Sequence, residues 1–233
     1  MNGIRSLAPT MHALWQRHEV LANDLANAST PGFKMDDVAW VAPPGSGADA
    51  VAKPVPWTSF LAGAITPTGR ALDVALDGRG FLVTETPAGP RYTRGGPLSV
   101  SPDGVLVTGS GAPVLGASGP ITVGRDAGGV TIAASGDVLV GGRKVDTLRV
   151  VEFAGTPPLV KDGGGRFAPA DGAPAPSPAK ATTVVGGALE ASNVNPVSVM
   201  VGMIDVLRRY ETAQKLIQAE DETVRRAGEI GKV

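Results

Sequence analysis

The chain has 233 residues, and its 21 lysines and arginines nearly balance 22 aspartates and glutamates, which gives a formal net charge of −1. A near-neutral chain without a basic tract is not built to coat nucleic acid or an anionic membrane. Because it has no cysteine, it can form no disulfide, no thiolate metal site and no cysteine nucleophile.

The first 25 residues predict an amphipathic helix, because apolar side chains recur every three or four residues. A proline inside a helix removes a hydrogen bond, so we expect the stable helix to begin near Pro9. It should end before Thr30, since Pro31 and Gly32 stop it. The apolar stripe consists of Ile4, Leu7, Met11, Leu14, Leu21 and Leu25, with His18 as a polar member.

The same N-terminal residues lack the unbroken apolar core of a cleavable signal peptide. Nowhere does the chain carry the roughly 18 consecutive apolar residues that a membrane-spanning helix needs. We therefore expect no Sec-type signal and a protein that is soluble before it assembles.

The middle of the chain predicts a connector followed by a β-rich domain. Residues 35–71 hold several prolines and glycines with little periodicity, which predicts an extended connector. In residues 72–188, short runs of Val, Ile, Leu and Thr alternate with turn residues, which predicts antiparallel strands. Turns are expected at Pro102-Asp103-Gly104 and Ser135-Gly136-Asp137, and a long surface loop at residues 163–178. The runs include residues 98–100, 105–108, 121–123, 130–133, 138–140 and 148–153.

Residues 189–233 predict a second helix. Asn195 can cap a helix, and Pro196 suits its first position. Beyond them, one register of mainly apolar residues repeats at alternating spacings of four and three. Its members are Val199, Met203, Val206, Tyr210, Ala213, Ile217, Glu220 and Val224.

The predicted fold class is therefore α+β. The terminal helices, within residues 1–34 and 189–233, are expected to form a coiled-coil-like core domain, with the antiparallel β-rich domain between them in sequence. An isolated helix with one apolar stripe is marginal in water, so each helix needs the other terminus or another subunit as its partner. Polymerisation is the expected behaviour.

Three motifs stand at residues 21–34 (LANDLANASTPGFK), 72–78 (LDVALDG) and 189–195 (LEASNVN). They resemble motifs of the axial proteins of the bacterial flagellar rod and hook. The short length and the Thr30-Pro31-Gly32-Phe33 version of the first motif indicate a proximal-rod type, with a distal-rod or hook-type member as the alternative. Further matches are Gly80-Phe81, Tyr92-Thr93-Arg94, Met203-Ile204, Arg208 and Tyr210-Glu211.

The resemblance implies a structural subunit of the basal-body rod and no enzyme activity. It also implies export through the flagellar type III apparatus without signal cleavage, and assembly in the periplasm into a hollow shaft that transmits torque and surrounds the export channel. The implied partners are copies of the chain, neighbouring proximal and distal rod proteins, and the export apparatus. No cofactor, metal, small-molecule substrate, nucleic acid or membrane insertion is expected.

Subunit contacts are expected along both helical stripes and at the motif residues beside them. For Asn23 and Asn27, four apart on one helical face, the alternative to an interface role is a polar face that ends in a cap. For Thr30 to Phe33, the alternative to a subunit-docking turn is a helix terminator with one anchoring aromatic ring. The candidate interface residues are Leu7, Met11, Leu14, Leu21, Asn23, Leu25, Asn27, Pro31, Phe33, Asn193, Val199, Met203, Val206, Tyr210, Ile217 and Val224.

Catalytic interpretations have little support in the sequence. His18-Glu19 begins a zinc-protease motif, but the second histidine would have to stand at Ala22. The glycines at residues 163–165 lack the Lys and Ser or Thr of a phosphate loop, and Asp73 and Asp77 fit a strand and turn better than a carboxylate pair. A secreted β-rich binding protein dimerised by its helices is the alternative from another class, and a hydrolase with an unfamiliar site ranks last.

Overall fold

The computed structural model describes residues 3–41, 53–124 and 129–230, and the side chains of all of these except residues 3–8, 40, 53–54, 224 and 227–230. The chain forms two compact units. The helical unit comprises residues 1–28, 35–59 and 194–233, and the β-rich unit comprises residues 29–34 and 60–193. The expected connector, residues 35–71, is thus divided between both units and contains three strands.

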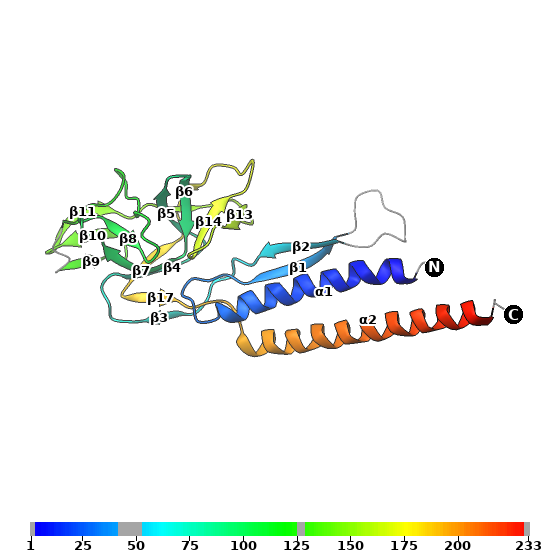
Figure 1. The fold of residues 1–233 in the computed structure, drawn as a ribbon. Coiled ribbons are helices and arrows are strands. Elements are labelled where there is room, and N and C mark those ends of the chain that lie inside the picture. Colours follow the sequence, from blue (N-terminus) through cyan, green and yellow to red (C-terminus); the bar gives the residue numbers. More distant parts are fainter. Residues whose placement is uncertain (1–2, 42–52, 125–128, 231–233) are drawn as a thin grey trace. The chain divides into compact units, whose positions relative to one another are not determined.

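In the helical unit, two long helices run antiparallel, and α1 packs on both α2 and β1 (Figure 1). Strands β1 and β2 pair antiparallel, from Asp36 opposite Thr58 to Val41 opposite Lys53. The elements are α1 (Gly3–Ala26), β1 (Asp36–Val41), β2 (Lys53–Thr58) and α2 (Pro196–Ile230).

The helix ends follow the sequence signals except at Pro9. The predicted cap is confirmed, because the Ser198 backbone N–H donates to Asn195 Oδ1 at 3.1 Å and α2 begins at Pro196. Helix α1 ends at Ala26, before Thr30 as predicted, but it begins at Gly3 and runs through Pro9. The predicted start near Pro9 is therefore wrong: a proline removes one helical hydrogen bond, and the turns on both sides of it still form.

The prediction of a coiled-coil-like core domain is wrong. A coiled coil buries two positions of every heptad against the partner helix. Among the α2 side chains that the structure describes, only Val199, Val206 and Ala213, one position in seven, are buried, whereas Met203 and Tyr210 are half-buried. Helix α1 divides its packing between α2 and β1, and the larger unit of the chain is built of β-sheet. Periodicity groups the residues that share a helical face, but it does not reveal what covers that face.

The β-rich unit consists of short antiparallel strands. Their order is β13-β14-β6-β5-β12-β15 in one sheet, β16-β4-β7-β8 in a second, β11-β10-β9 in a third and β17-β3 in a fourth. The strands are β3 (Ile65–Pro67), β4 (Asp73–Asp77), β5 (Phe81–Thr86), β6 (Gly89–Thr93), β7 (Gly95–Val100), β8 (Leu106–Thr108), β9 (Val130–Ile132), β10 (Asp137–Val140), β11 (Arg143–Thr147), β12 (Val150–Glu152), β13 (Leu159–Lys161), β14 (Arg166–Pro169), β15 (Ser177–Pro178), β16 (Thr183–Gly186) and β17 (Ala188–Glu190).

Both predicted turns are confirmed. They join β7 to β8 and β9 to β10, each pair antiparallel, and place Gly104 and Gly136 at φ of 78° and 84°. The prediction of one long surface loop at residues 163–178 is wrong, because this segment contains two strands, β14 and β15, and Phe167 in β14 is buried. The glycines at 163–165 turn between β13 and β14. The expected reading of Asp73 and Asp77 as strand residues is confirmed, because they bound β4.

Two hydrophobic cores stabilise the β-rich unit, and β5 contributes to both. Successive side chains of a strand point to opposite faces. Leu82 accordingly packs into an aliphatic core with Val74 and Leu106, while Phe81 lies in an aromatic core with Phe167. Because β5 is covered on both faces, its sequence begins with an unbroken run of apolar residues. Each buried side chain contributes roughly 1.5–3 kcal/mol to the stability of the folded unit.

Candidate assembly interface

The contact between α1 and α2 depends on small residues. Ala13 and Leu14 are buried on α1. A Cβ atom placed on Gly202 would lie 3.4 Å from Leu21 Cδ1, so the missing side chain lets Leu21 pack directly on the backbone of α2. This contact joins the two ends of the chain within one helical unit.

The candidate interface residues of both stripes are largely used by packing inside the chain. Leu14, Val199 and Val206 are buried. The side chains of Leu7 and Val224 lie outside the described residues. The half-buried members are Met11, Leu21, Leu25, Met203, Tyr210 and Ile217.

A second apolar stripe, which we call the outer stripe, lies on the opposite side of α2. With 3.6 residues per turn, Ile204 projects about 180° away from Val206 and Ala213. Its side chain is 53% exposed, and that of Val197 is 70% exposed. The sequence signal was available but overlooked, because we followed only one register of α2. The outer stripe comprises Val197, Met200, Val201, Ile204 and Leu207.

A hollow of about 460 Å³ lies between the helices, further along α2. Leu14, Ala213 and Leu216 supply its apolar lining, and Arg208 and Arg209 border it. Leu216 is 54% exposed there. The hollow therefore lies on the side of α2 that faces α1, whereas the outer stripe lies on the opposite side.

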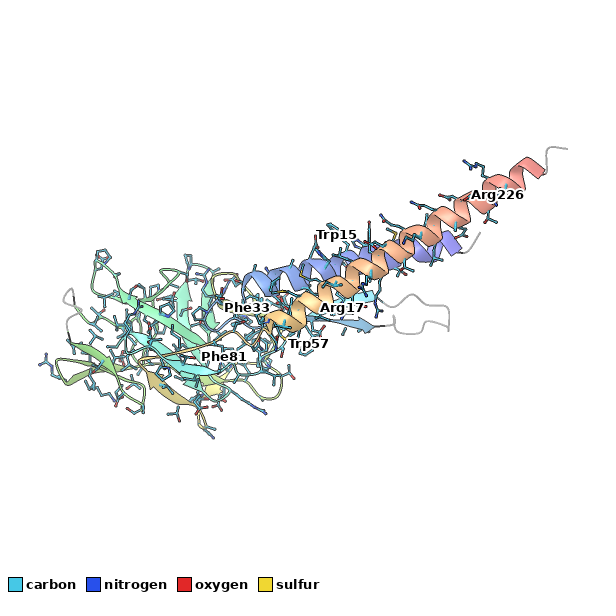
Figure 2. All side chains as sticks on the ribbon, turned by 90° about the horizontal axis from the view of Figure 1, so that it is seen from below. Trp15, Arg17, Phe33, Trp57, Phe81 and Arg226 are labelled. Atoms are coloured by element: carbon cyan, nitrogen blue, oxygen red, sulfur yellow. The ribbon has the colours of Figure 1, made fainter. Side chains whose placement is uncertain are left out.

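The helical unit also exposes tryptophan rings. Trp15 is half-exposed on α1, stacks on His18 with ring centroids 5.8 Å apart, and donates from Nε1 to Glu19 Oε1 at 3.0 Å (Figure 2). Trp57 on β2 is also half-exposed. Among the described residues, no three or more histidine, aspartate or glutamate side chains are grouped as metal ligands, and no described helix is long and apolar enough to cross a membrane.

The asparagines at the end of α1 have local roles. Asn23 is exposed, and its carbonyl oxygen accepts a hydrogen bond from Asn27 Nδ2 at 2.9 Å. This bond satisfies a carbonyl of the last turn, which supports the cap interpretation. Asp24, which sequence reasoning passed over, is buried and accepts from the Asp36 backbone N–H at 3.1 Å, so it ties the end of α1 to the start of β1.

The motif residues after α1 and before α2 meet inside the β-rich unit. Pro31, Phe33 and Asn193 are half-buried there. The Lys161 ammonium lies 4.0 Å from the centroid of the Phe33 ring, a cation–π contact. The Asn193 backbone N–H donates to the Phe33 carbonyl at 3.3 Å. Phe33 thus anchors the segment that ends α1, as the helix-terminator interpretation expects.

Sequence reasoning missed a buried ion cluster next to these residues. Glu190 Oε1 lies 2.6 Å from Lys34 Nζ, and Glu190 Oε2 lies 2.9 Å from Arg94 Nε. All three side chains are almost fully buried. Burial lowers the pKa of the Lys34 ammonium, and the hydrogen bond to Glu190 opposes that shift. Lys34 and Glu190 belong to two of the three motifs, and Arg94 belongs to the further match Tyr92-Thr93-Arg94. Membership in matches to one family was the only signal that could have grouped them.

Comparison with known proteins covers both units. Residues 75–140 match the family described as "Flagellar hook protein FlgE/F/G D1 domain", and residues 185–229 match "Flagellar basal body rod FlgEFG protein C-terminal". The flagellar basal-body rod protein FlgF of Caulobacter vibrioides is 34% identical over an alignment of 227 residues, which covers 92% of this chain and 92% of its own. FlgF of Salmonella typhimurium is 36% identical, covering 91% of this chain and 90% of its own. FlgG of Bacillus subtilis is 28% identical, covering 88% and 89%.

The chain consists of a helical unit that contains both chain ends and of a β-rich unit. The family matches fall in both units, and together they define a structural protein of the flagellar axis. Within that class, the chain belongs to the flagellar basal-body rod protein family and is FlgF-like. The predicted resemblance and the role of a rod subunit in the basal body are confirmed.

Proposed function

We propose that the chain joins the rod through its helical unit, with the outer stripe of α2 covered by neighbouring rod subunits. A helix that is apolar on all sides is normally buried on all sides. The first turns of α2 have this character, because Val199 and Val206 face inward while Val201 and Ile204 face solvent. This arrangement is the observation that carries the proposal.

The outer stripe is large enough to drive assembly. Fully burying one such side chain contributes roughly 1.5–3 kcal/mol, so covering the exposed part of each of its five members adds about 1 kcal/mol or more. Repeated in every subunit of a polymer, such contacts stabilise the shaft cooperatively. The candidate residues Leu14 and Val206 then act indirectly, since they hold α2 in place and leave the outer stripe free.

The finer role follows the family resemblance. The subunit takes a proximal position in the rod, crosses the periplasm as part of a hollow shaft that transmits torque, and surrounds the export channel. It reaches this position through the flagellar type III apparatus, without cleavage of a signal peptide. It acts as a structural protein without catalysis or cofactor, in keeping with a sequence that lacks cysteine and has two histidines.

The test is Ile204→Asp, which places a charge in the outer stripe, against Gln214→Asp, which introduces the same group at an exposed polar position of α2. Hook–basal bodies purified from cells with each variant as the sole copy are analysed by quantitative mass spectrometry. Ile204→Asp should be exported and folded but nearly absent from basal bodies, and Gln214→Asp should be incorporated like the parent. Normal incorporation and swimming with Ile204→Asp would refute the proposal.

A further inference from the structure

The peptide that follows α1 and the peptide that precedes α2 lie side by side in the β-rich unit. The Gly32 backbone N–H donates to the Glu190 carbonyl at 2.7 Å, and the Asn193 N–H donates to the Phe33 carbonyl. Asn193 Nδ2 and Lys34 Nζ both donate to the Leu61 carbonyl, at 3.1 and 2.6 Å. Two segments far apart in sequence are thus bonded to each other and to one shared loop.

The Glu190 carboxylate is the centre of this arrangement. Its Oε1 accepts from Lys34 Nζ and from the Gly63 backbone N–H at 2.9 Å, and its Oε2 accepts from Arg94 Nε. Arg94 in turn donates to the carbonyls of Leu76 and Gly78, at 2.9 and 2.8 Å, and of Gly80. One side chain therefore connects the N-terminal segment, the strands of the β-rich unit and the C-terminal segment.

Such a cluster is poorly explained as a source of stability. Removing charges from water is costly, and apolar residues of the same volume often replace a buried ion pair without loss. This cluster also holds two cations for one carboxylate, which adds to that cost. What a buried, fully hydrogen-bonded network does provide is a single permitted arrangement of its parts.

We propose that the Lys34–Glu190–Arg94 cluster is a latch that holds residues 29–34 and 191–193 in register, so that only a subunit with both segments docked is competent for assembly. Lys34, Glu190 and Arg94 act as positioning residues. The assembly part of this proposal rests on the proposed function, whereas the register part is a property of the β-rich unit alone.

The test uses the full-length protein with Lys34→Met, which keeps an unbranched side chain one atom shorter and removes its charge. Arg94 and Glu190 then remain as a pair of single opposite charges, and the Leu61 carbonyl keeps its bond from Asn193. The matched control is Lys144→Met, which removes a lysine from an exposed ion pair with Asp137 in the same unit. Glu190→Gln, nearly isosteric, is the second test variant.

Amide hydrogen exchange by mass spectrometry is the direct readout. In Lys34→Met, exchange in residues 29–34 and 191–193 should rise on the order of 10-fold or more, while peptides from β5 keep the parental rate. Glu190→Gln should raise exchange further in both segments, and Lys144→Met should leave both unchanged. Unchanged exchange in either segment of Lys34→Met overturns the latch. If Glu190→Gln fails to fold, Lys34→Met alone decides the matter.

Incorporation into basal bodies is the second readout. Lys34→Met should be incorporated several-fold less than Lys144→Met, and parental incorporation despite faster exchange overturns the assembly role. Ile204→Asp separates the two proposals, because it should lose incorporation while exchange in residues 29–34 stays parental. If Ile204→Asp assembles normally, the outer stripe is refuted, and the exchange data still decide whether the latch exists.

Discussion

Replacing Gly63 by alanine tests whether the β-rich unit depends on the close approach of the backbone at residue 63 to the backbone at residue 191. A Cβ atom on Gly63 would lie 1.9 Å from the Ala191 carbonyl oxygen, where contacts under 3.0 Å are essentially never seen. The backbone φ of Gly63 lies outside the left-handed region, so the added methyl acts by steric clash alone. Residues 63 and 191 must therefore move apart.

The cost can be worked out from the bonds that this movement breaks. The Ala191 N–H donates to the Ala64 carbonyl at 2.7 Å, a neutral hydrogen bond worth about 0.5–1.5 kcal/mol. The Gly63 N–H donates to the Glu190 carboxylate, a charged bond worth about 1.5–3 kcal/mol. We expect Gly63→Ala to lower the free energy of unfolding of the β-rich unit by about 2–4.5 kcal/mol.

The assay is calorimetric unfolding read beside tryptophan fluorescence. Trp15, Trp40 and Trp57 all belong to the helical unit, so fluorescence follows that unit and should stay close to parental, while the calorimetric transition of the β-rich unit moves to lower temperature. The matched control is Gly109→Ala, because a Cβ there meets Pro97 at an ordinary 3.8 Å. The control should be neutral or stabilise by about 0.4–1 kcal/mol. Equal transitions in the two variants would refute the reasoning.

Two further predictions concern single side chains. Asn195→Ala removes the acceptor for the Ser198 N–H and should destabilise α2 by about 1 kcal/mol, measured by fluorescence-detected urea unfolding; no loss would mean that the cap is not used. Hydrogen bonds from Lys144 and then Thr147 lower the pKa of Asp137 to about 2 from 3.8. Its contribution to stability is therefore complete above pH 3.8 and is lost as the pH falls through about 2. NMR titration should find this midpoint, and Lys144→Met should raise it; an ordinary midpoint in the parent would contradict the contact.

Local features of the fold could be predicted from the sequence. The cap at Asn195 and the turns at Gly104 and Gly136 depend on a few neighbouring residues, whose conformational preferences act wherever they occur. The strands around these turns were found for the same reason. By contrast, Ile121 lies in an expected strand but is not part of one, although its side chain is fully buried. An apolar run predicts burial more reliably than it predicts the backbone conformation.

The partners of each face could be predicted only in part. The register through Val199 and Val206 was identified, and the other terminal helix, one of its two expected partners, packs against α2. The coiled-coil geometry expected for that packing was wrong. The outer stripe through Val201 and Ile204 was overlooked, because the register through Val199 does not include all the apolar residues of α2. Lys34 and Glu190 both lie in motifs that the sequence analysis singled out. No pattern of neighbouring residues indicates that two charges so distant in sequence form an ion pair.

The separation of Lys34 and Glu190 in sequence also determines when their ion pair can form during the folding of the chain. The two residues are 156 positions apart. Closing a loop of that length costs about 4.5 kcal/mol of chain entropy plus a constant. A chain that emerges N-terminus first presents its lysine long before the carboxylate, so residues 29–34 cannot dock while the chain is incomplete. A truncated copy that ends before residue 190 therefore cannot form the Lys34–Glu190 ion pair, so the pair distinguishes it from a copy that extends past this residue.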